Sequence, residues 1–192
     1  MFKLYRFENM LSTMNLTGEE IRKYLEYSYS EWLNTMKNAN DYLLKYRLGQ
    51  DGKPLLTGNK IWLKNQPYNF DSAAGIKYIV DASKPDGQRV KIVSLSDGRR
   101  FDEQQTYKVA INSYRANGGG GHLVKGAGIK SDELRSRIVS STDRDLRYYL
   151  MKSIEAKKTI SPAPLNNWKI IPEKWVEAAA AREYVLLFGV AK

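Results

Sequence analysis

NSYRANGGGGH, residues 112–122, predicts an unusual backbone conformation, because four glycines follow one another shortly after a β-rich run. Consecutive glycines lose much conformational entropy when they become ordered, so they are favoured where the backbone adopts a positive φ or passes close to another group. A flexible surface loop is the alternative that composition leaves open. The run lacks the Gly-Lys-Ser or Gly-Lys-Thr ending of a phosphate-binding P-loop, which excludes that motif.

A strand and a helix are predicted near the beginning of the chain. Residues 10–16 form a β-rich run that leads directly into Thr17-Gly18-Glu19-Glu20. This tetrapeptide reads as a capping box, in which the Thr17 hydroxyl and the Glu20 carboxylate satisfy end amides reciprocally. Apolar residues then recur at helical spacing and predict one buried helix face. They are Ile21, Tyr24, Leu25, Trp32, Leu33 and Met36.

The middle of the chain reads as a sheet. Three β-rich runs, at residues 76–80, 90–95 and 106–112, are separated by Pro85-Asp86-Gly87 and by Asp97-Gly98. Turn pairs of this kind between β-rich runs predict an antiparallel meander.

The remainder of the chain predicts further strands and a second helix. Short strands are expected at residues 137–139, 168–171 and 184–188. A helix is expected to start at Thr142-Asp143-Arg144-Asp145 and to bury Leu146, Tyr149, Leu150 and Ile154. Because no linker is long enough to divide the chain, residues 1–192 are predicted to form a single layered α+β domain. Its sheet should be mixed and mainly antiparallel, with flanking helices.

Composition excludes several classes of site. Lys and Arg number 31 against 21 Asp and Glu, which gives a formal charge of +10 and favours anionic partners. The charges are spread along the chain, so most are expected to form a solvated surface. The absence of Cys excludes disulfides, thiolate metal sites and a cysteine nucleophile. No stretch approaches the roughly 20 apolar residues of a membrane span.

The titratable residues do not predict a catalytic centre. His122 is the single histidine, and one imidazole cannot build a multi-histidine dimetal site. No Asp or Glu cluster has metal-ligand spacing, so neither catalytic nor metal-binding residues are predicted. We expect His122 to pack within the loop and Arg115 to lie on the surface.

Residues 112–122 resemble the signature of the C-terminal domain of the 5'-nucleotidase family, in which an aromatic residue precedes an Ala-Asn-Gly-Gly turn. Phe7, the strand after it and Leu-Thr-Gly-Glu-Glu-Ile at residues 16–21 are similar to that family's first element. Further motifs are similar to the branch of bacterial 2',3'-cyclic-nucleotide 2'-phosphodiesterase/3'-nucleotidases. They read Tyr-Asn-Phe-Asp at 68–71, Gly-Ile-Lys-Tyr at 75–78, Asp-Ala-Ser-Lys-Pro at 81–85 and Asn-Asn-Trp at 166–168.

The resemblance implies a nucleotide-binding domain whose hydrolytic site lies on another domain. In this family an N-terminal metallophosphatase domain carries two divalent metal ions that activate water. The C-terminal domain holds the nucleoside between two aromatic side chains, which correspond to Phe7 and Tyr114. Further substrate-binding positions implied are Asn117, Gly118, Gly119 and Gly120. Asn117 is also a residue type that fixes turns.

Two departures from the family qualify this resemblance. Many members carry a ribose-binding Asp where this chain has Gly120. Members also place a substrate-binding Asn and Arg before the first aromatic, and this sequence contains no such segment. The resemblance therefore implies a domain truncated at its N-terminus, a metallophosphatase domain in the same parent chain or in a partner chain, and export to the periplasm or cell surface.

Two other functions remain open at this point. A non-enzymatic module for single-stranded nucleic acid would use the basic charge and several aromatic platforms along one groove. We consider nucleic acid the less favoured partner, because the resemblance needs only one pair of rings. A structural or interface domain without ligand binding is the other alternative.

Overall fold

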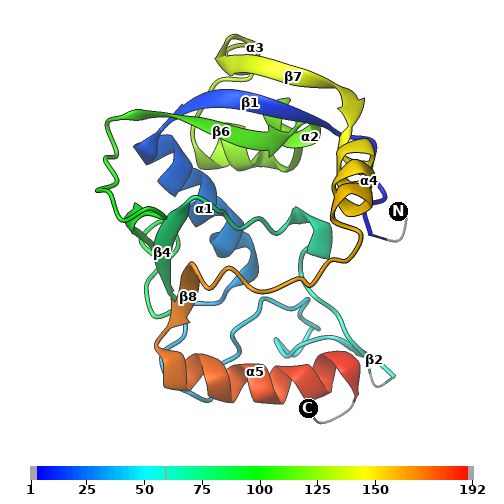
Figure 1. Cartoon of the computed structure of the whole chain (residues 1–192). Coiled ribbons are helices and arrows are strands. Elements are labelled where there is room, and N and C mark those ends of the chain that lie inside the picture. Colours follow the sequence, from blue (N-terminus) through cyan, green and yellow to red (C-terminus); the bar gives the residue numbers. More distant parts are fainter. Residues whose placement is uncertain (1–3, 59, 190–192) are drawn as a thin grey trace. The chain divides into compact units, whose positions relative to one another are not determined.

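A computed structural model of the chain describes residues 4–58 and 60–189 (Figure 1). The contacts group them into two units, each assembled from two separate segments. Unit 1 contains the chain up to Ile21 together with residues 102–165, and unit 2 contains residues 22–101 and the chain from Asn166. Each unit combines a small sheet with helices, which confirms the predicted α+β class.

The sheet of unit 1 has the order β6-β1-β7 and is antiparallel throughout. Its strands are β1 (Met10–Thr17), β6 (Thr106–Asn112) and β7 (Ile138–Asp145). Alternate residues of β1, at Ser12, Met14 and Leu16, are buried, as the period of two in a strand requires. The core of unit 1 therefore lies against one face of its central strand.

The predicted capping box begins helix α1 (Gly18–Trp32). The Glu20 carboxylate accepts from the Thr17 backbone N–H at 2.7 Å, and the Thr17 hydroxyl accepts from the Glu20 N–H at 3.2 Å. Leu25 on the predicted apolar face is buried. The helix ends at Trp32, so the buried Leu33 and Met36 follow it instead of continuing it.

Short helices fill the rest of unit 1. After β6 come α2 (Ser113–Ala116), η2 (Gly119–Gly121), η3 (His122–Gly126) and α3 (Leu134–Arg137), and α4 (Leu146–Lys157) follows β7. Asp145 caps α4 by accepting from the Tyr148 N–H at 2.9 Å, close to the predicted start. The predicted buried face of α4 is wrong, since none of its residues is buried. The apolar spacing is present, but within unit 1 nothing packs fully over it.

The sheet of unit 2 has the order β5-β4-β8. Strand β4 (Ile76–Asp81) pairs antiparallel with β5 (Val90–Leu95) and parallel with β8 (Trp168–Ile171). The other elements are the short hairpin β2 (Leu56–Thr57) and β3 (Lys60–Ile61), the turn η1 (Pro67–Asn69) and helix α5 (Glu173–Phe188). An aromatic cluster of Tyr29, Phe70, Tyr78 and Trp168 forms part of its core.

Two predictions for these strands are wrong. Strand β6 does not continue a meander from β5, because it pairs with β1 in the sheet of unit 1. Residues 184–188 belong to α5 rather than to a strand, since four consecutive alanines at 178–181 favour one continuous helix. Among the described residues, no helix is both long and apolar enough to cross a membrane.

Candidate functional site

Phe7 and Tyr114 lie next to the same end of one pair of strands. Phe7 precedes β1 and Tyr114 follows β6, in α2. The two strands are antiparallel with Leu11 opposite Asn112, so the residues before one and after the other leave the sheet together. The Ser113 hydroxyl also accepts from the Met10 backbone N–H at 3.0 Å. Sheet pairing therefore brings together two sequence positions that are far apart in the chain.

Neither ring is sealed in the interior. Phe7 is 43% exposed and Tyr114 is 47% exposed. Phe7 meets Tyr5 edge to face, with ring centroids 6.4 Å apart, and the Asn9 side-chain amide donates to the Tyr5 hydroxyl at 3.0 Å. Both rings thus retain surface that a ligand can cover.

The segment that carries Phe7 is held by an ion-pair cluster. The Arg147 guanidinium donates to Glu8, beside Phe7, at 2.8 Å and to Asp145 at 2.6 Å. Hydrogen bonds to Glu8 and Asp145 raise the pKa of Arg147, and the pKa of Asp145 is lowered by its bond from the Tyr148 N–H and then by Arg147. The cluster links the chain before β1 to the start of α4.

The four glycines form an ordered turn. Gly118, Gly120 and Gly121 have φ values of 88°, 73° and 82°, which side chains with a Cβ rarely adopt. Gly119 is required for a different reason, since a Cβ there would lie 2.5 Å from the Tyr114 ring. The close approach predicted for this loop is therefore made by its backbone to the ring of Tyr114.

Asn residues fix the two ends of α2. The Asn112 side-chain oxygen accepts from the Arg115 N–H at 2.8 Å and caps the helix. Asn117 donates its side-chain amide to the Ser113 carbonyl at 2.8 Å, which confirms a turn-forming role for this residue.

Arg115 is buried, so the prediction that it lies on the surface is wrong. It is 2% exposed, and its Nη1 donates to the Gly119 carbonyl at 3.2 Å. Its guanidinium carbon lies 5.3 Å from the Tyr114 ring centroid, within cation–π distance. Arg115 therefore ties the glycine turn to the aromatic ring, a role that its sequence position beside a loop did not reveal.

His122 packs inside the loop, as predicted, and is 1% exposed at the start of η3. The resemblance assigns the dimetal site to another domain, and no metal-binding residues are predicted in this chain. In the part of the chain that the structure describes, no three His, Asp or Glu side chains gather to hold a metal ion. What the described geometry offers is two half-exposed rings, Phe7 and Tyr114, next to the same end of β1 and β6.

Comparison with known proteins places these features in context. The family model described as "5'-nucleotidase, C-terminal domain" matches residues 1–126, more than half of the chain. The chain is 29% identical over 184 residues to a trifunctional nucleotide phosphoesterase of Bacillus subtilis, covering 88% of this chain and 11% of that protein. It is 27% identical over 181 residues to a 2',3'-cyclic-nucleotide 2'-phosphodiesterase/3'-nucleotidase of Salmonella typhimurium, covering 88% of this chain and 25% of that protein.

A crystal structure from Staphylococcus aureus, of a protein assigned as a 5'-nucleotidase, superposes with a TM-score of 0.62 at 21% identity. The superposition covers 88% of this chain and 28% of the Staphylococcus aureus chain. At 21% identity, the similarity shows the fold alone. The chain thus spans 11% and 25% of the two curated relatives, a small part of either protein.

Proposed function

The chain belongs to the family of 5'-nucleotidase C-terminal domains, and we propose that it is the nucleotide-binding domain of a metal-dependent phosphoesterase. The base stacks between Phe7 and Tyr114. Phosphate ester hydrolysis takes place on a metallophosphatase domain, in the same parent chain or in a partner chain, that carries two divalent metal ions. The complete enzyme acts in nucleotide catabolism in the periplasm or at the cell surface.

The observation that carries this proposal is the pair of half-exposed rings at one end of β1 and β6. Every nucleobase has a flat π face, and stacking on an aromatic side chain contributes about 1 to 3 kcal/mol per base. Two such contacts hold a nucleoside without selecting one base. This suits the names of the two curated relatives, which refer to nucleotides without naming a base.

The rigidity of the glycine turn supports the same role. The Tyr114 ring lies against Gly119 and near the buried Arg115, so little freedom is left for it to lose on binding. A side chain that is already ordered makes association less costly in entropy. Asn117, Gly118 and Gly120 belong to the same turn, and in this proposal they contact the nucleoside that stacks on that ring.

The test measures AMP binding to the 192-residue chain by titration calorimetry, with wild type, Tyr114→Ala and Tyr114→Phe compared. We expect Tyr114→Ala to weaken binding by roughly one to two orders of magnitude, because one stacked contact is lost. Tyr114→Phe should bind nearly as the wild type, since the ring face is retained. Tyr68→Ala in unit 2, where the side chain is 59% exposed, is the matched control and should have no effect.

Two outcomes would reject the proposal in different ways. If a thymidine oligomer binds far more tightly than AMP and with a steep salt dependence, the domain is a single-stranded nucleic-acid module. If neither ligand binds this chain nor its longer parent protein, a structural role is the better account.

A further inference from the structure

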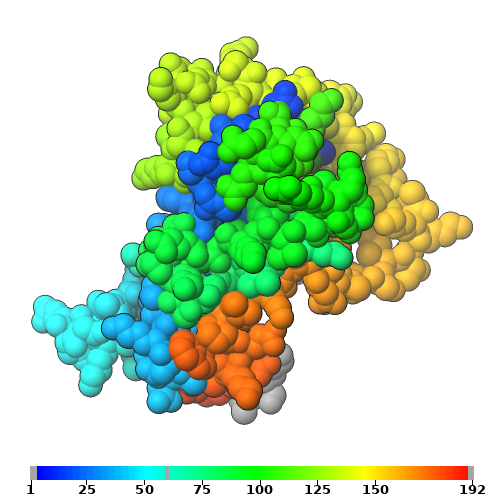
Figure 2. All heavy atoms as spheres, turned by 90° about the vertical axis from the view of Figure 1, so that its left-hand side faces the viewer, coloured from blue at the N-terminus to red at the C-terminus, as the bar shows by residue number. Residues whose placement is uncertain are grey.

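Unit 2 contains a partly open hollow of about 850 Å³ between residues 34–64 and the last turns of α5. This volume lies within the roughly 300 to 1,000 Å³ typical of small-molecule sites. The segment of residues 45–58, drawn in cyan, projects from unit 2 in Figure 2 and supplies much of the lining. The hollow shares no residue with the glycine turn of unit 1.

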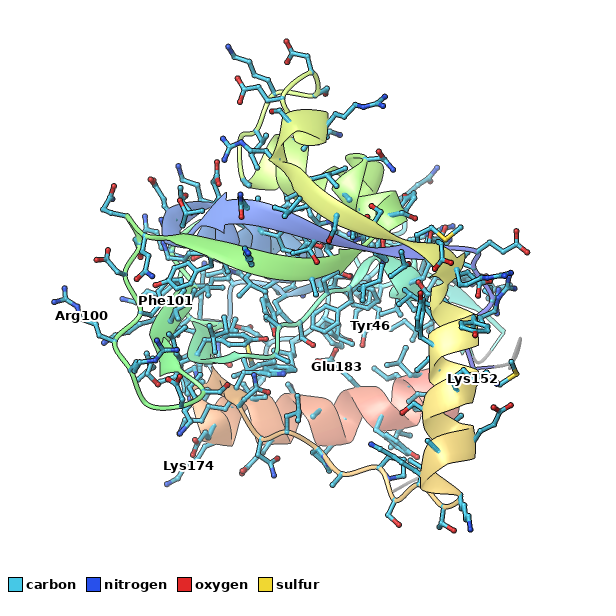
Figure 3. The ribbon with its side chains drawn as sticks, turned by 45° about the horizontal axis from the view of Figure 1, so that its top comes forward. Tyr46, Arg100, Phe101, Lys152, Lys174 and Glu183 are labelled. Carbon is cyan, nitrogen blue, oxygen red and sulfur yellow. The ribbon has the colours of Figure 1, made fainter. Side chains whose placement is uncertain are left out.

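The inner lining of the hollow is apolar. Tyr46 and Ile61 are 5% and 4% exposed, and Leu56, Pro54 and Leu186 line it as well. Behind Tyr46 lies the buried carboxylate of Glu183, on α5 (Figure 3). It accepts from the Tyr46 hydroxyl at 2.5 Å and from the Leu43 and Leu44 N–H groups at 2.5 and 3.0 Å. Three donors thus compensate this charge, and Tyr46 is fixed in place.

The rim of the hollow is basic. Lys45, Arg47, Lys53 and Lys64 all line it, and no Asp or Glu stands among the described lining residues. Lys45 is engaged with Asp86 at 3.2 Å, and the Arg47 guanidinium lies 5.8 Å from the centre of the Trp62 ring. Lys53 and Lys64 are exposed. The hollow therefore joins an apolar interior to a positively charged mouth.

We propose that this hollow is a second ligand site, which binds an amphiphilic anion such as a fatty acid. The alkyl chain lies against Tyr46, Ile61 and Leu186, and the carboxylate lies among Arg47, Lys53 and Lys64. Removing an alkyl chain from water drives the binding, and the basic mouth orients the head group.

The interior is poorly suited to a nucleobase. The Asn34 side-chain amide already donates to the Leu44 carbonyl at 2.6 Å, and the Tyr46 hydroxyl is bonded to Glu183. A buried base would leave its polar edge unpaired there, which disfavours binding by the full desolvation penalty of those groups. An alkyl chain has no such requirement.

The test measures binding of dodecanoate to the 192-residue chain by titration calorimetry, at concentrations below ligand aggregation. Dodecanol, dodecylammonium and AMP serve as comparison ligands. We expect dodecanoate to bind more tightly than dodecanol, and its affinity to fall with added salt because exposed charges are screened. Dodecylammonium should bind most weakly.

Charge reversal tests the mouth. The double variant Lys53→Glu with Lys64→Glu should weaken dodecanoate binding roughly tenfold, because each exposed ion pair contributes up to about fivefold in affinity. The matched control, Lys77→Glu with Lys174→Glu, makes the same change in net charge at exposed positions of unit 2 outside the hollow and should bind as the wild type. Leu56→Glu, at a side chain 56% exposed, tests the apolar lining and should also weaken binding.

Three results would overturn the proposal. If dodecanoate and dodecanol bound with equal affinity, the basic side chains at the mouth would have no role in binding the carboxylate. If both double variants lost the same dodecanoate affinity, the ligand would be attracted by the net positive charge of the chain and not by the basic mouth. Displacement of dodecanoate by AMP would make the hollow a nucleotide site. Since Tyr114→Ala leaves this hollow unchanged, failure here is separable from failure of the proposed nucleotide clamp.

Discussion

The core aromatic cluster of unit 2 contrasts with the exposed rings of unit 1. In unit 2, Tyr29 and Tyr78 are 0% and 2% exposed, and their hydroxyls are 2.9 Å apart inside the aromatic cluster. In unit 1, none of the aromatic side chains that the structure describes is buried, and Phe7 and Tyr114 are nearly half exposed.

The contrast teaches how an exposed ring is held in place. Tyr29 and Tyr78 of unit 2 are fixed by packing inside the aromatic cluster, which is the ordinary role of aromatics in a core. The backbone of the glycine turn holds the Tyr114 ring instead. Gly119 has no Cβ that would collide with the ring, and the Arg115 side chain donates a hydrogen bond to the Gly119 carbonyl. Such a ring stays ordered while offering surface to a ligand.

The largest expected effect is a loss of stability caused by a substitution in the core of unit 2. Tyr29→Ala should lower the free energy of unfolding by about 3 to 5 kcal/mol, because a fully buried ring and its hydroxyl bond to Tyr78 are lost. Urea denaturation followed by tryptophan fluorescence measures this. Tyr68→Ala, at an exposed ring of the same unit, should change stability by no more than about 0.5 kcal/mol. A loss for Tyr114→Ala as large as that for Tyr29→Ala would contradict the contrast between the units.

The next effect tests the backbone support of Tyr114. Gly119→Ala places a Cβ against the ring and should cost about 1 to 3 kcal/mol of stability, as overpacking does, while strongly weakening AMP binding. Gly128→Ala is the control, since Gly128 has a φ of 78° with open space around its Cβ position. That variant should lose about 1 to 2 kcal/mol through strain and keep its AMP affinity. Unchanged AMP binding in Gly119→Ala would show that the ring needs no such support.

A smaller effect concerns α4, which buries no residue and so depends on its cap. Asp145→Ala should lower stability by about 1 kcal/mol, whereas Asp145→Asn should retain most of the cap. Because its bond from the Tyr148 N–H lowers the pKa of Asp145, the stabilisation is present above the ordinary carboxyl pKa and is lost as pH falls through the depressed value. Thermal unfolding by circular dichroism at pH 7 and at acid pH measures both effects. Equal stability of Asp145→Ala and wild type would exclude the capping role.

The smallest effect has the opposite pH dependence. Burial raises the pKa of Glu26 in unit 2, so the native state binds its proton more tightly than the unfolded chain does. Stability should therefore rise as pH falls through the raised pKa towards the ordinary value. Glu26→Gln should lack this contribution, and the wild type should gain relative to it between pH 7 and pH 5. Denaturation at both values tests this, and a difference independent of pH would contradict it.

Many local elements were predictable. The capping box at Thr17 and Glu20, strands 90–95, 106–112 and 168–171, and the need for glycine at 118–121 depend on residues close together in sequence. Strand 184–188 was wrong because a short apolar run does not distinguish strand from helix. The buried face of α4 was wrong because periodicity indicates a face without showing that anything covers it.

Local sequence therefore determines helix caps, side-chain periodicity and the turns that need glycine, since each of these involves only neighbouring residues. The pairing of β6 with β1, the position of Phe7 and Tyr114 next to the same end of these strands, and the burial of Arg115 depend on contacts between distant residues. Turn residues such as Asp97-Gly98 indicate that the chain reverses direction. Which strand pairs with which depends on the packing of the whole sheet.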